Sequence, residues 1–201
     1  MAMNSMDSDL YQWFNRLSAD TTWAHGIAAA YANYGIALFG VVLLIVWWNG
    51  RAAGDTRVVS TAVWAGAACL IAIGLAQPLV SAVNRDRPYA KHPASVVLVD
   101  KSTDPSFPSD HATVSGAIAG GLWLTRRRIR YIAVGLALVM AFDRVYVGAH
   151  YPGDVVAGLA FGGLIGLIGG RYVIPLIHRI LDRLQPSAVG RLISAVSIKP
   201  R

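Results

Sequence analysis

The stretch GDVVAGLAFGGLIGLIGG occupies residues 153–170 and carries the pattern that decides the fold. Within this apolar run, Gly158, Gly162, Gly166 and Gly170 recur every four residues. In a helix this spacing places small residues on one face, and small residues let two helix backbones approach closely in lipid. The stretch therefore predicts a closely packed membrane helix. It does not imply a dimer, because such strings also arise by chance in glycine-rich spans.

The composition of the whole chain is that of a membrane protein. Of its 201 residues, 55% are hydrophobic and 14% are charged, whereas a soluble domain is typically about 25% charged. A bilayer-spanning helix needs about 20 mostly apolar residues, and five runs are candidates. We therefore expect an all-α, polytopic transmembrane helical bundle of five spans, or of six if the long first run contains two. The candidate runs are residues 22–48, 58–83, 111–125, 131–149 and 153–175, of which the third is short.

The amino-terminal segment predicts a helix of a different kind. Residues 8–18 place apolar side chains at spacings of three and four, which is typical of a short amphipathic helix lying in the membrane interface. No cleavable signal peptide is expected, because the segment lacks a basic start followed by an apolar core. We expect one integral-membrane domain over the whole chain, 1–201. Its parts are an interfacial helix at 1–20, a membrane core at 22–175 and a basic cytoplasmic tail at 176–201.

The distribution of Lys and Arg predicts the orientation. The segments 49–57, 126–130 and 171–201 would share one side of the membrane and hold twelve of these residues, against six on the other side. By the positive-inside rule the side with twelve is cytoplasmic, so the polar motifs described below face outward from a bacterial plasma membrane. The net charge of +7 does not indicate nucleic-acid binding, because the cations flank apolar runs rather than alternating with exposed aromatic residues.

Three polar strings lie at the ends of apolar runs, and one of them is Arg144-x(5)-His150-x(3)-Asp154. A spacing of four stacks two side chains on one face of a helix. We therefore expect Asp154 to accept the Nδ1–H of His150, which would leave Nε2 unprotonated and directed at a ligand. Taken alone, the string is also compatible with a His–Asp pair that merely caps a helix.

The second string is Pro108-Ser109-Asp110-His111, at the start of another predicted helix. Ser109 or Asp110 can cap that helix, and the free backbone N–H groups of a helix start attract anions. His111 adds a second imidazole at the same place. A plain helix cap is the alternative interpretation of this string on its own.

The third string is Arg85-Asp86-Arg87-Pro88, which follows the second apolar run. The planar guanidinium of arginine matches the oxygens of a phosphate. Arg85, Arg87 and Arg144 all lie on the side of the membrane that is poor in cations, so the orientation bias does not explain them. The alternative is that they reach toward lipid headgroups.

Together the three strings supply guanidiniums, imidazoles, a hydroxyl and a carboxylate, the groups that a metal-free phosphate-transfer site needs. Two histidines and one carboxylate would also satisfy zinc. Three nearby arginines would repel a metal cation, however, so we expect neither a metal nor another cofactor.

The combination resembles the type 2 phosphatidic acid phosphatase superfamily, whose motifs are written Lys-x(6)-Arg-Pro, Pro-Ser-Gly-His and Ser-Arg-x(5)-His-x(3)-Asp. The resemblance covers roughly residues 84–170 and departs from the pattern at Val80, Asp110 and Asp143, where the family has Lys, Gly and Ser. The sequences NRDRPY, SFPSDHAT and YVGAHYPGDV are similar to the bacitracin-resistance-type undecaprenyl-diphosphatases. Arg85 is then expected to replace the missing lysine, and Asp143 has no explanation.

The resemblance implies an enzyme that dephosphorylates a polyprenyl diphosphate of the undecaprenyl type to the monophosphate on the outer face, recycling the lipid carrier of cell-wall synthesis. His150 would form a phosphohistidine, Asp154 would orient it, and His111 would protonate the leaving oxygen and then activate water. The substrate phosphate would be bound by Arg85, Arg87, Ser109, Asp110 and Arg144.

Two alternatives stay open at this point. The first is a phosphatase for another lipid, namely phosphatidylglycerophosphate, phosphatidate or a polyprenyl-phosphosugar phosphate. The second is a transporter of anionic lipids, which would more typically show broken helices and internal repeats. The expected partners are the lipid substrate and membrane lipids, and the sequence leaves the oligomeric state unknown.

Overall fold

The computed structural model describes residues 5–187 and 190–195, and these residues form helices and connecting segments without a β-strand. The all-α prediction is confirmed. A single 3₁₀ turn, Thr22–Ala24, precedes the second helix. The α-helices are α1 Ser5–Asp20, α2 His25–Ala53, α3 Thr56–Val83, α4 Pro88–Lys91, α5 Asp110–Leu122, α6 Arg127–Tyr146, α7 Pro152–Leu184 and α8 Gly190–Ile193.

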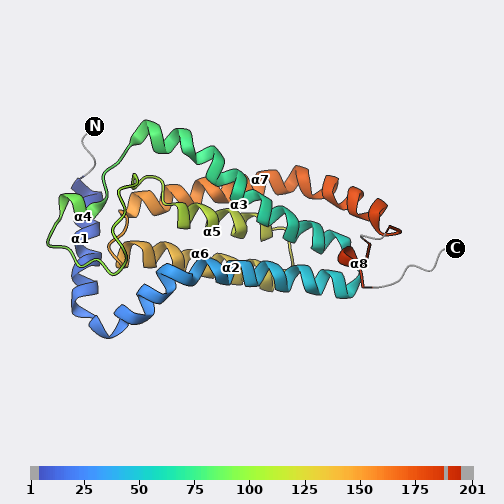
Figure 1. Cartoon of the computed structure of the whole chain (residues 1–201), viewed down its shortest axis with the longest axis horizontal. Coiled ribbons are helices and arrows are strands. Elements are labelled where there is room, and N and C mark those ends of the chain that lie inside the picture. Colours follow the sequence, from blue (N-terminus) through green and yellow to red (C-terminus); the bar gives the residue numbers. More distant parts are fainter. Residues whose placement is uncertain (1–4, 188–189, 196–201) are drawn as a thin grey trace.

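Five of these helices run side by side along the long axis of the molecule, namely α2, α3, α5, α6 and α7 (Figure 1). Helices α1 and α4 and the segment 92–109 lie at one end of this bundle, and α8 lies at the other. Since consecutive long helices alternate in direction, the starts of α5 and α7 and the end of α6 reach the same end. That end is the one covered by α1.

Three helical stretches are long and apolar enough to cross a membrane, at Thr22–Ala53, Thr56–Lys91 and Pro152–Leu184. The two other predicted spans are shorter or more polar than expected. Helix α5 has 13 residues, and at 1.5 Å per residue it extends about 20 Å, less than the hydrocarbon core of about 30 Å. Helix α6 has 20 residues and carries charged residues in its first and last turns.

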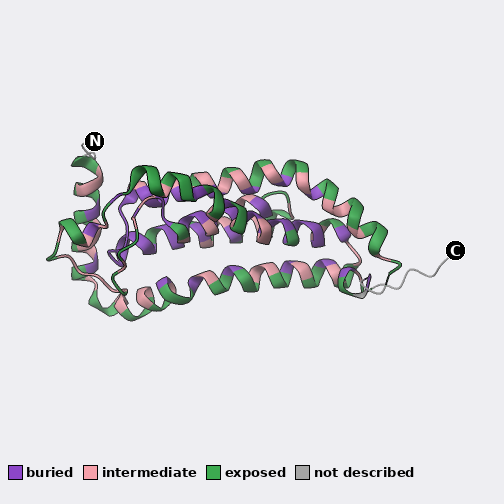
Figure 2. Ribbon diagram, turned by 45° about the horizontal axis from the view of Figure 1, so that its top comes forward, coloured by how far each residue is buried: buried purple, intermediate pink, exposed green. Residues whose placement is uncertain are grey.

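Helix α5 is short, but it lies inside the bundle, where the other helices surround it. Nine of its 13 residues are buried, and Figure 2 shows it as buried along most of its length, with exposed surface on the helices around it. Protein rather than lipid therefore surrounds the polar side chains of Thr113 and Ser115. Their hydroxyls donate to backbone carbonyls one turn earlier in the helix.

The closely packed face that the four-residue spacing predicted lies against α5 at Gly158, Gly162 and Gly166, whereas Gly170 lies against Trp64 of α3. A Cβ atom on Gly162 would overlap the carbonyl oxygen of Thr113, and one on Gly166 would overlap that of Ala117. Any side chain at these positions would push the two backbones apart. The seam between α5 and α7 therefore sets how closely the two helix starts, and the polar strings on them, can approach.

Two helices end later in the structure than the sequence predicted. Helix α2 continues to Ala53, where Gly54 adopts a left-handed conformation with φ 67° and ends the helix. Helix α7 passes through Pro175, the expected end of the last span, and continues to Leu184. Much of the predicted basic tail at 176–201 is therefore helical, and its residues 188–189 and 196–201 lie outside the described part.

Helix α1 confirms the predicted amphipathic segment and lies across the end of the bundle (Figure 1). The side chains of Leu10 and Trp13 are 43% and 50% exposed, whereas Tyr11 is fully buried. On the buried side, the Asn15 amide donates to the carbonyl oxygen of Val96 at 2.8 Å and accepts from its N–H at 3.1 Å. Helix α1 thus binds the long connection as well as presenting an apolar face.

Candidate active site

A cavity of about 600 Å³ opens at the end of the bundle that α1 covers. The ends of four helices contribute to it, and the predicted strings supply most of its polar lining. Arg87, Asp110, His111, Arg144 and His150 line it, together with Ala32 and Asn33 of α2 and Gln77 and Val80 of α3. The structure therefore brings one or more residues of each string to a common cavity.

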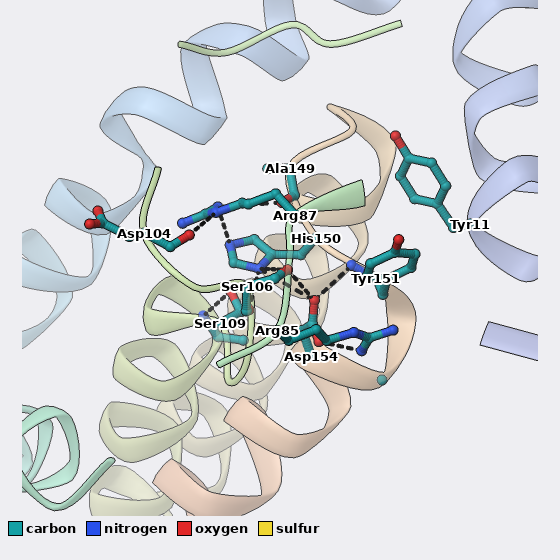
Figure 3. A network of polar contacts seen from close by, with 12 residues as sticks. Tyr11, Arg85, Arg87, Asp104, Ser106, Ser109, Ala149, His150, Tyr151 and Asp154 are labelled. Carbon is teal, nitrogen blue, oxygen red and sulfur yellow. Dashed lines mark hydrogen bonds and ion pairs between the residues drawn. The ribbon is translucent and has the colours of Figure 1, made fainter. Parts of the chain in front are cut away.

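His150 lies in the turn between α6 and α7, with one ring nitrogen toward each side of the site (Figure 3). Its Nδ1 is 2.8 Å from the backbone carbonyl oxygen of Ser106. Because a carbonyl oxygen can only accept, Nδ1 carries the proton and Nε2 is unprotonated. On the other side, Arg87 Nη1 lies 3.1 Å from Nε2. His150 therefore presents a free lone pair next to a guanidinium.

Burial, with a smaller contribution from the nearby Arg87 and Arg144 guanidiniums, lowers the pKa of the His150 imidazole to about 4 against the opposing effect of the Asp154 carboxylate. At neutral pH the ring is neutral. A neutral imidazole has the lone pair that a nucleophile needs.

The expected direct hydrogen bond between Asp154 and His150 is wrong, because Asp154 Oδ2 lies 3.7 Å from Nδ1. The Ser106 hydroxyl stands between them. It donates to Asp154 Oδ2 at 2.5 Å and lies 3.4 Å from His150 Nδ1. A spacing of four puts the two side chains on one face only inside a helix, and His150 precedes the first residue of α7. Asp154 therefore supports His150 through Ser106 and through its charge.

Asp154 is fully buried and is held by three donors. Besides Ser106, these are the backbone N–H of Tyr151 at 2.9 Å and Arg85 Nη1 at 2.5 Å. Asp154 thus caps the start of α7, as the plain interpretation of its string had it. The same carboxylate also faces the histidine, so the two interpretations are compatible.

Arg85 does not take the expected place beside the phosphate. Its Nη1 donates to Asp154 and its Nη2 to Asp7, each at 2.5 Å, and its guanidinium lies 3.9 Å from the ring centroid of Tyr151. The described residues that line the cavity do not include it. The residue just before it, Asn84, adopts a left-handed conformation with φ 41° and ends α3. Arg85 therefore turns away from the cavity and toward two carboxylates.

Arg87 and Arg144 supply the positive charge on the cavity side. Arg87 is held in place by the carbonyl oxygens of Asp104, at 3.0 Å from Nε, and Ala149, at 3.3 Å from Nη1. The Nε atom of Arg144 is buried and has no hydrogen-bond partner among the described residues. A buried donor without a partner is costly, and the Nε atom of Arg85 is in the same state. The Oδ2 atom of Asp143 is also buried without a described partner, and nothing in the structure explains this residue.

Ser109 and Asp110 begin α5. Ser109 is the N-cap, its hydroxyl accepts from the backbone N–H of Ala112, and its own N–H donates to the backbone oxygen of Asp154 at 3.1 Å. Its side chain is fully buried, so a direct contact with phosphate stays a prediction. Asp110 lines the cavity, and its negative charge would repel a phosphate unless the carboxyl is protonated. Its expected part in binding also stays a prediction.

Two residues of the site, Ser106 and Asp7, were not predicted from the sequence. Ser106 belongs to the quoted string SFPSDHAT, yet no spacing shows that its hydroxyl faces Asp154. Asp7 lies 78 positions before Arg85 in the sequence. Its helix was predicted from the spacing of apolar residues, which gives no indication of a role for an acidic side chain. Within the described residues there is no group of three or more His, Cys, Asp or Glu side chains arranged to hold a metal ion.

Comparisons with known proteins agree with this geometry. The profile of the PAP2 superfamily matches residues 61–177. The undecaprenyl-diphosphatase BcrC of Bacillus subtilis is 26% identical over 181 residues, which cover 90% of this chain and 87% of that protein. The decaprenylphosphoryl-5-phosphoribose phosphatase of Mycobacterium tuberculosis is 40% identical over 112 residues, or 53% of this chain and 61% of that protein.

One solved structure shares the fold. The crystal structure of Aquifex aeolicus LpxE superposes with a TM-score of 0.53 over 85% of this chain and 89% of that chain. The two sequences are 21% identical in the comparison. This likeness supports the helical architecture and carries no statement about substrate.

Proposed function

This chain belongs to the PAP2 superfamily and is a membrane-bound lipid phosphatase, and from that premise we propose that it converts a polyprenyl diphosphate of the undecaprenyl type to the monophosphate through a phosphohistidine. The observation that carries the mechanism is the placement of His150, whose unprotonated Nε2 lies 3.1 Å from the Arg87 guanidinium at the cavity. A nucleophile and a phosphate-binding cation are thereby side by side.

In the first half-reaction, Arg87 and Arg144 bind the terminal phosphate, and the Nε2 lone pair of His150 attacks its phosphorus in line. The bond from phosphorus to the bridging oxygen breaks, and the lipid monophosphate leaves. His111 lines the same cavity, where burial and the nearby Arg144 guanidinium lower its pKa to about 4 while the site is empty. The negative charge of the bound diphosphate raises that pKa, so that His111 takes up a proton with the substrate and gives it to the leaving oxygen. The histidine ring becomes positive as it is phosphorylated, and the Asp154 carboxylate, 3.7 Å from Nδ1, stabilises that charge.

In the second half-reaction, water attacks the phosphohistidine. His111, now neutral after giving up its proton, accepts a proton from this water, and the P–N bond breaks. Inorganic phosphate leaves and His150 returns to its starting form. The hydrogen bond from Nδ1 to the Ser106 carbonyl holds the ring in one tautomer during both steps.

The position of the cavity supports a lipid substrate. Besides the arginines and histidines, its lining includes Ala32 and Asn33 of α2 and Gln77 and Val80 of α3. Both of these helices are long and apolar enough to cross a membrane. A substrate with a phosphate in the cavity can therefore leave its chain beside membrane helices.

We propose that the site faces outward from the plasma membrane of a bacterium. The opposite end of the bundle carries the arginine-rich segments 49–57 and 126–130 and the end of α7, which by the positive-inside rule are cytoplasmic. A cysteine introduced at position 95 should react with an impermeant thiol reagent on intact spheroplasts, in a Cys69→Ala background. Labelling that requires membrane rupture would overturn this orientation.

A second candidate is the removal of phosphate from a polyprenyl-phosphosugar phosphate. The observation that favours it is the 40% identity to the mycobacterial decaprenylphosphoryl-5-phosphoribose phosphatase, which is higher than the 26% identity to BcrC, although it covers a shorter part of the chain. Both candidates use the same nucleophile and differ in the group that leaves.

Phosphate release by the purified protein distinguishes the candidates. The panel contains undecaprenyl diphosphate, phosphatidylglycerophosphate, phosphatidate and a decaprenyl-phosphosugar phosphate, with His150→Ala as the inactive control. The highest kcat/KM on the diphosphate is expected, and the highest value on the phosphosugar would favour the second candidate. Denaturation of the enzyme during turnover of ³²P-labelled substrate should yield an acid-labile, alkali-stable phosphoprotein, and its absence would overturn the covalent mechanism.

A further inference from the structure

An acidic side chain of α1 reaches the back of the active site. Asp7 Oδ2 accepts from Arg85 Nη2 at 2.5 Å, and Asp7 Oδ1 accepts from the backbone N–H of Gly153 at 2.8 Å. The Asp7 side chain is 18% exposed, so water has little access to it. One carboxylate thus joins α1, the segment after α3 and the first turn of α7.

These contacts continue without interruption to the nucleophile. Arg85 binds Asp7 with one terminal nitrogen and Asp154 with the other. Asp154 in turn accepts from Ser106, which adjoins His150 (Figure 3). The backbone N–H of Ser106 also donates to the carbonyl oxygen of Arg85 at 2.7 Å. A displacement of Arg85 would therefore move both Asp154 and Ser106.

Packing fixes the position of α1 and hence of Asp7. Tyr11, one turn further along α1, is fully buried, and its ring centroid lies 5.4 Å from that of Tyr151 and 5.7 Å from that of His92. The Ser8 hydroxyl is 3.0 Å from His92 Nε2. Asp7 is consequently presented to Arg85 by a helix that is itself bound to the start of α7.

The charge balance shows what Asp7 contributes. The Arg85 side chain is 5% exposed, and a buried guanidinium needs acidic partners and hydrogen-bond acceptors. Asp154 can meet only part of this need of the Arg85 guanidinium, because its carboxylate also accepts from Ser106 and from the Tyr151 N–H. Without the Asp7 carboxylate, Arg85 Nη2 would lose its acceptor. The guanidinium could then turn toward Asp154 Oδ2, the oxygen that accepts from Ser106.

We propose that Asp7 is a positioning residue for the phosphatase reaction: by holding Arg85 and the first turn of α7, it fixes the Asp154 carboxylate behind His150. The inference rests on the proposed function. It gives α1 a part in turnover in addition to its expected place in the membrane interface. Asp7 itself does not touch the substrate, since it lies on the far side of Asp154 from His150.

The test is Asp7→Asn, compared with Asp9→Asn as the matched control. Asp9 lies on the same helix and is exposed, so the chemical change is identical and the surroundings differ. We expect Asp7→Asn to lower kcat about tenfold and to leave KM within about twofold, because the phosphate-binding arginines are untouched. Asp9→Asn should match the wild type. Asp7→Glu, which restores the charge, should recover part of kcat.

A double-mutant cycle with Arg85→Gln tests whether Asp7 acts on Asp154 through Arg85. If Asp7 acts through Arg85, adding Asp7→Asn to Arg85→Gln should change kcat by less than about twofold. Full additivity of the two effects would overturn the proposed route. Equal kcat values for Asp7→Asn, Asp9→Asn and wild type would overturn the inference alone, whereas failure of the wild type to release phosphate from any member of the panel would overturn the proposed function as well.

A second variant keeps the inference testable if Asp7→Asn yields too little folded protein. A Cβ atom on Gly153 would lie 2.9 Å from Asp7 Oδ2, so Gly153→Ala displaces the carboxylate without removing its charge. Position 153 is helical, and alanine is favourable there. We expect a loss of kcat with unchanged KM, as in Asp7→Asn. Wild-type kcat in a folded Gly153→Ala protein would contradict the inference.

Discussion

Arginines lie on both sides of His150, but those on the cavity side differ in their partners from the one on the back side. The cavity side contains Arg87 and Arg144, and neither forms an ion pair with a carboxylate among the described residues. On the back side, Arg85 is bound by the carboxylates of Asp7 and Asp154. Cations that meet a substrate keep their charge available for it, whereas a cation that positions other groups is neutralised inside the protein, since buried charge is stable only when paired.

This difference predicts how substitutions on the two sides will act. Changes on the cavity side should weaken substrate binding and raise KM. Changes on the back side should lower kcat and stability while KM changes little. His150 belongs to both sides, because Nε2 faces the cavity and Nδ1 faces Ser106.

The largest effect is expected for His150→Ala. The proposed mechanism assigns the covalent intermediate to His150 and proton transfer to His111, so kcat should fall by at least about 10⁴-fold. Binding of the product, inorganic phosphate, should persist because Arg87 and Arg144 remain, and this can be measured by calorimetry in detergent. Substantial turnover by this variant would exclude His150 as the nucleophile.

Asp154→Asn should have the next largest effect. The amide keeps the shape but leaves Arg85 with one acidic partner, and it removes the negative charge 3.7 Å from Nδ1. We expect kcat to fall about 10²- to 10³-fold, less than in a triad with a direct hydrogen bond. Ser106→Ala is the companion variant and should lose about tenfold. A change under about threefold in Asp154→Asn would reduce Asp154 to a helix cap.

Two arginines separated by one residue give the sharpest contrast between the sides. Arg87→Ala should raise KM and reduce kcat/KM at least about tenfold, or about 1.4 kcal/mol. Arg85→Ala should leave KM nearly unchanged and lower the free energy of unfolding by about 3–5 kcal/mol, because the buried Asp154 carboxylate and the partly buried Asp7 carboxylate lose their partner. Steady-state kinetics and thermal unfolding separate the two outcomes.

Arg85 also tests the sequence-based expectation that it grips a diphosphate. From its position behind Asp154, Arg85→Ala should affect diphosphate and monophosphate substrates equally. A loss confined to diphosphates would instead place this side chain in the cavity during turnover.

The smallest effect is expected from removing metal ions. The positive charge at the cavity comes from guanidiniums, so excess EDTA should change phosphate release by less than about twofold. Dialysis against the chelator before the assay gives the stricter measurement. Complete loss of activity, restored by Mg²⁺ or Zn²⁺, would overturn the proposed metal-free mechanism.

The sequence alone determined the helices, their packing face and the end of the bundle where the chemistry lies. Apolar runs of about 20 residues and small residues at every fourth position act locally, because a helix forms its own hydrogen bonds and its side chains repeat every 3.6 residues. Gly162 and Gly166 therefore marked a close-packing face, although only the structure shows that α5 lies against it. The sequence also singled out Arg87, His111, Arg144 and His150, which line the cavity.

Only the tertiary structure decided which groups touch. The partner of Arg85 is Asp7, from a helix 78 positions earlier, and the residue between His150 and Asp154 is Ser106, from a connection without regular structure. No local period links such positions. Their contacts depend on how α1, the segment 92–109 and the starts of α5 and α7 close around one another, and on the need of each buried charge to find a partner there.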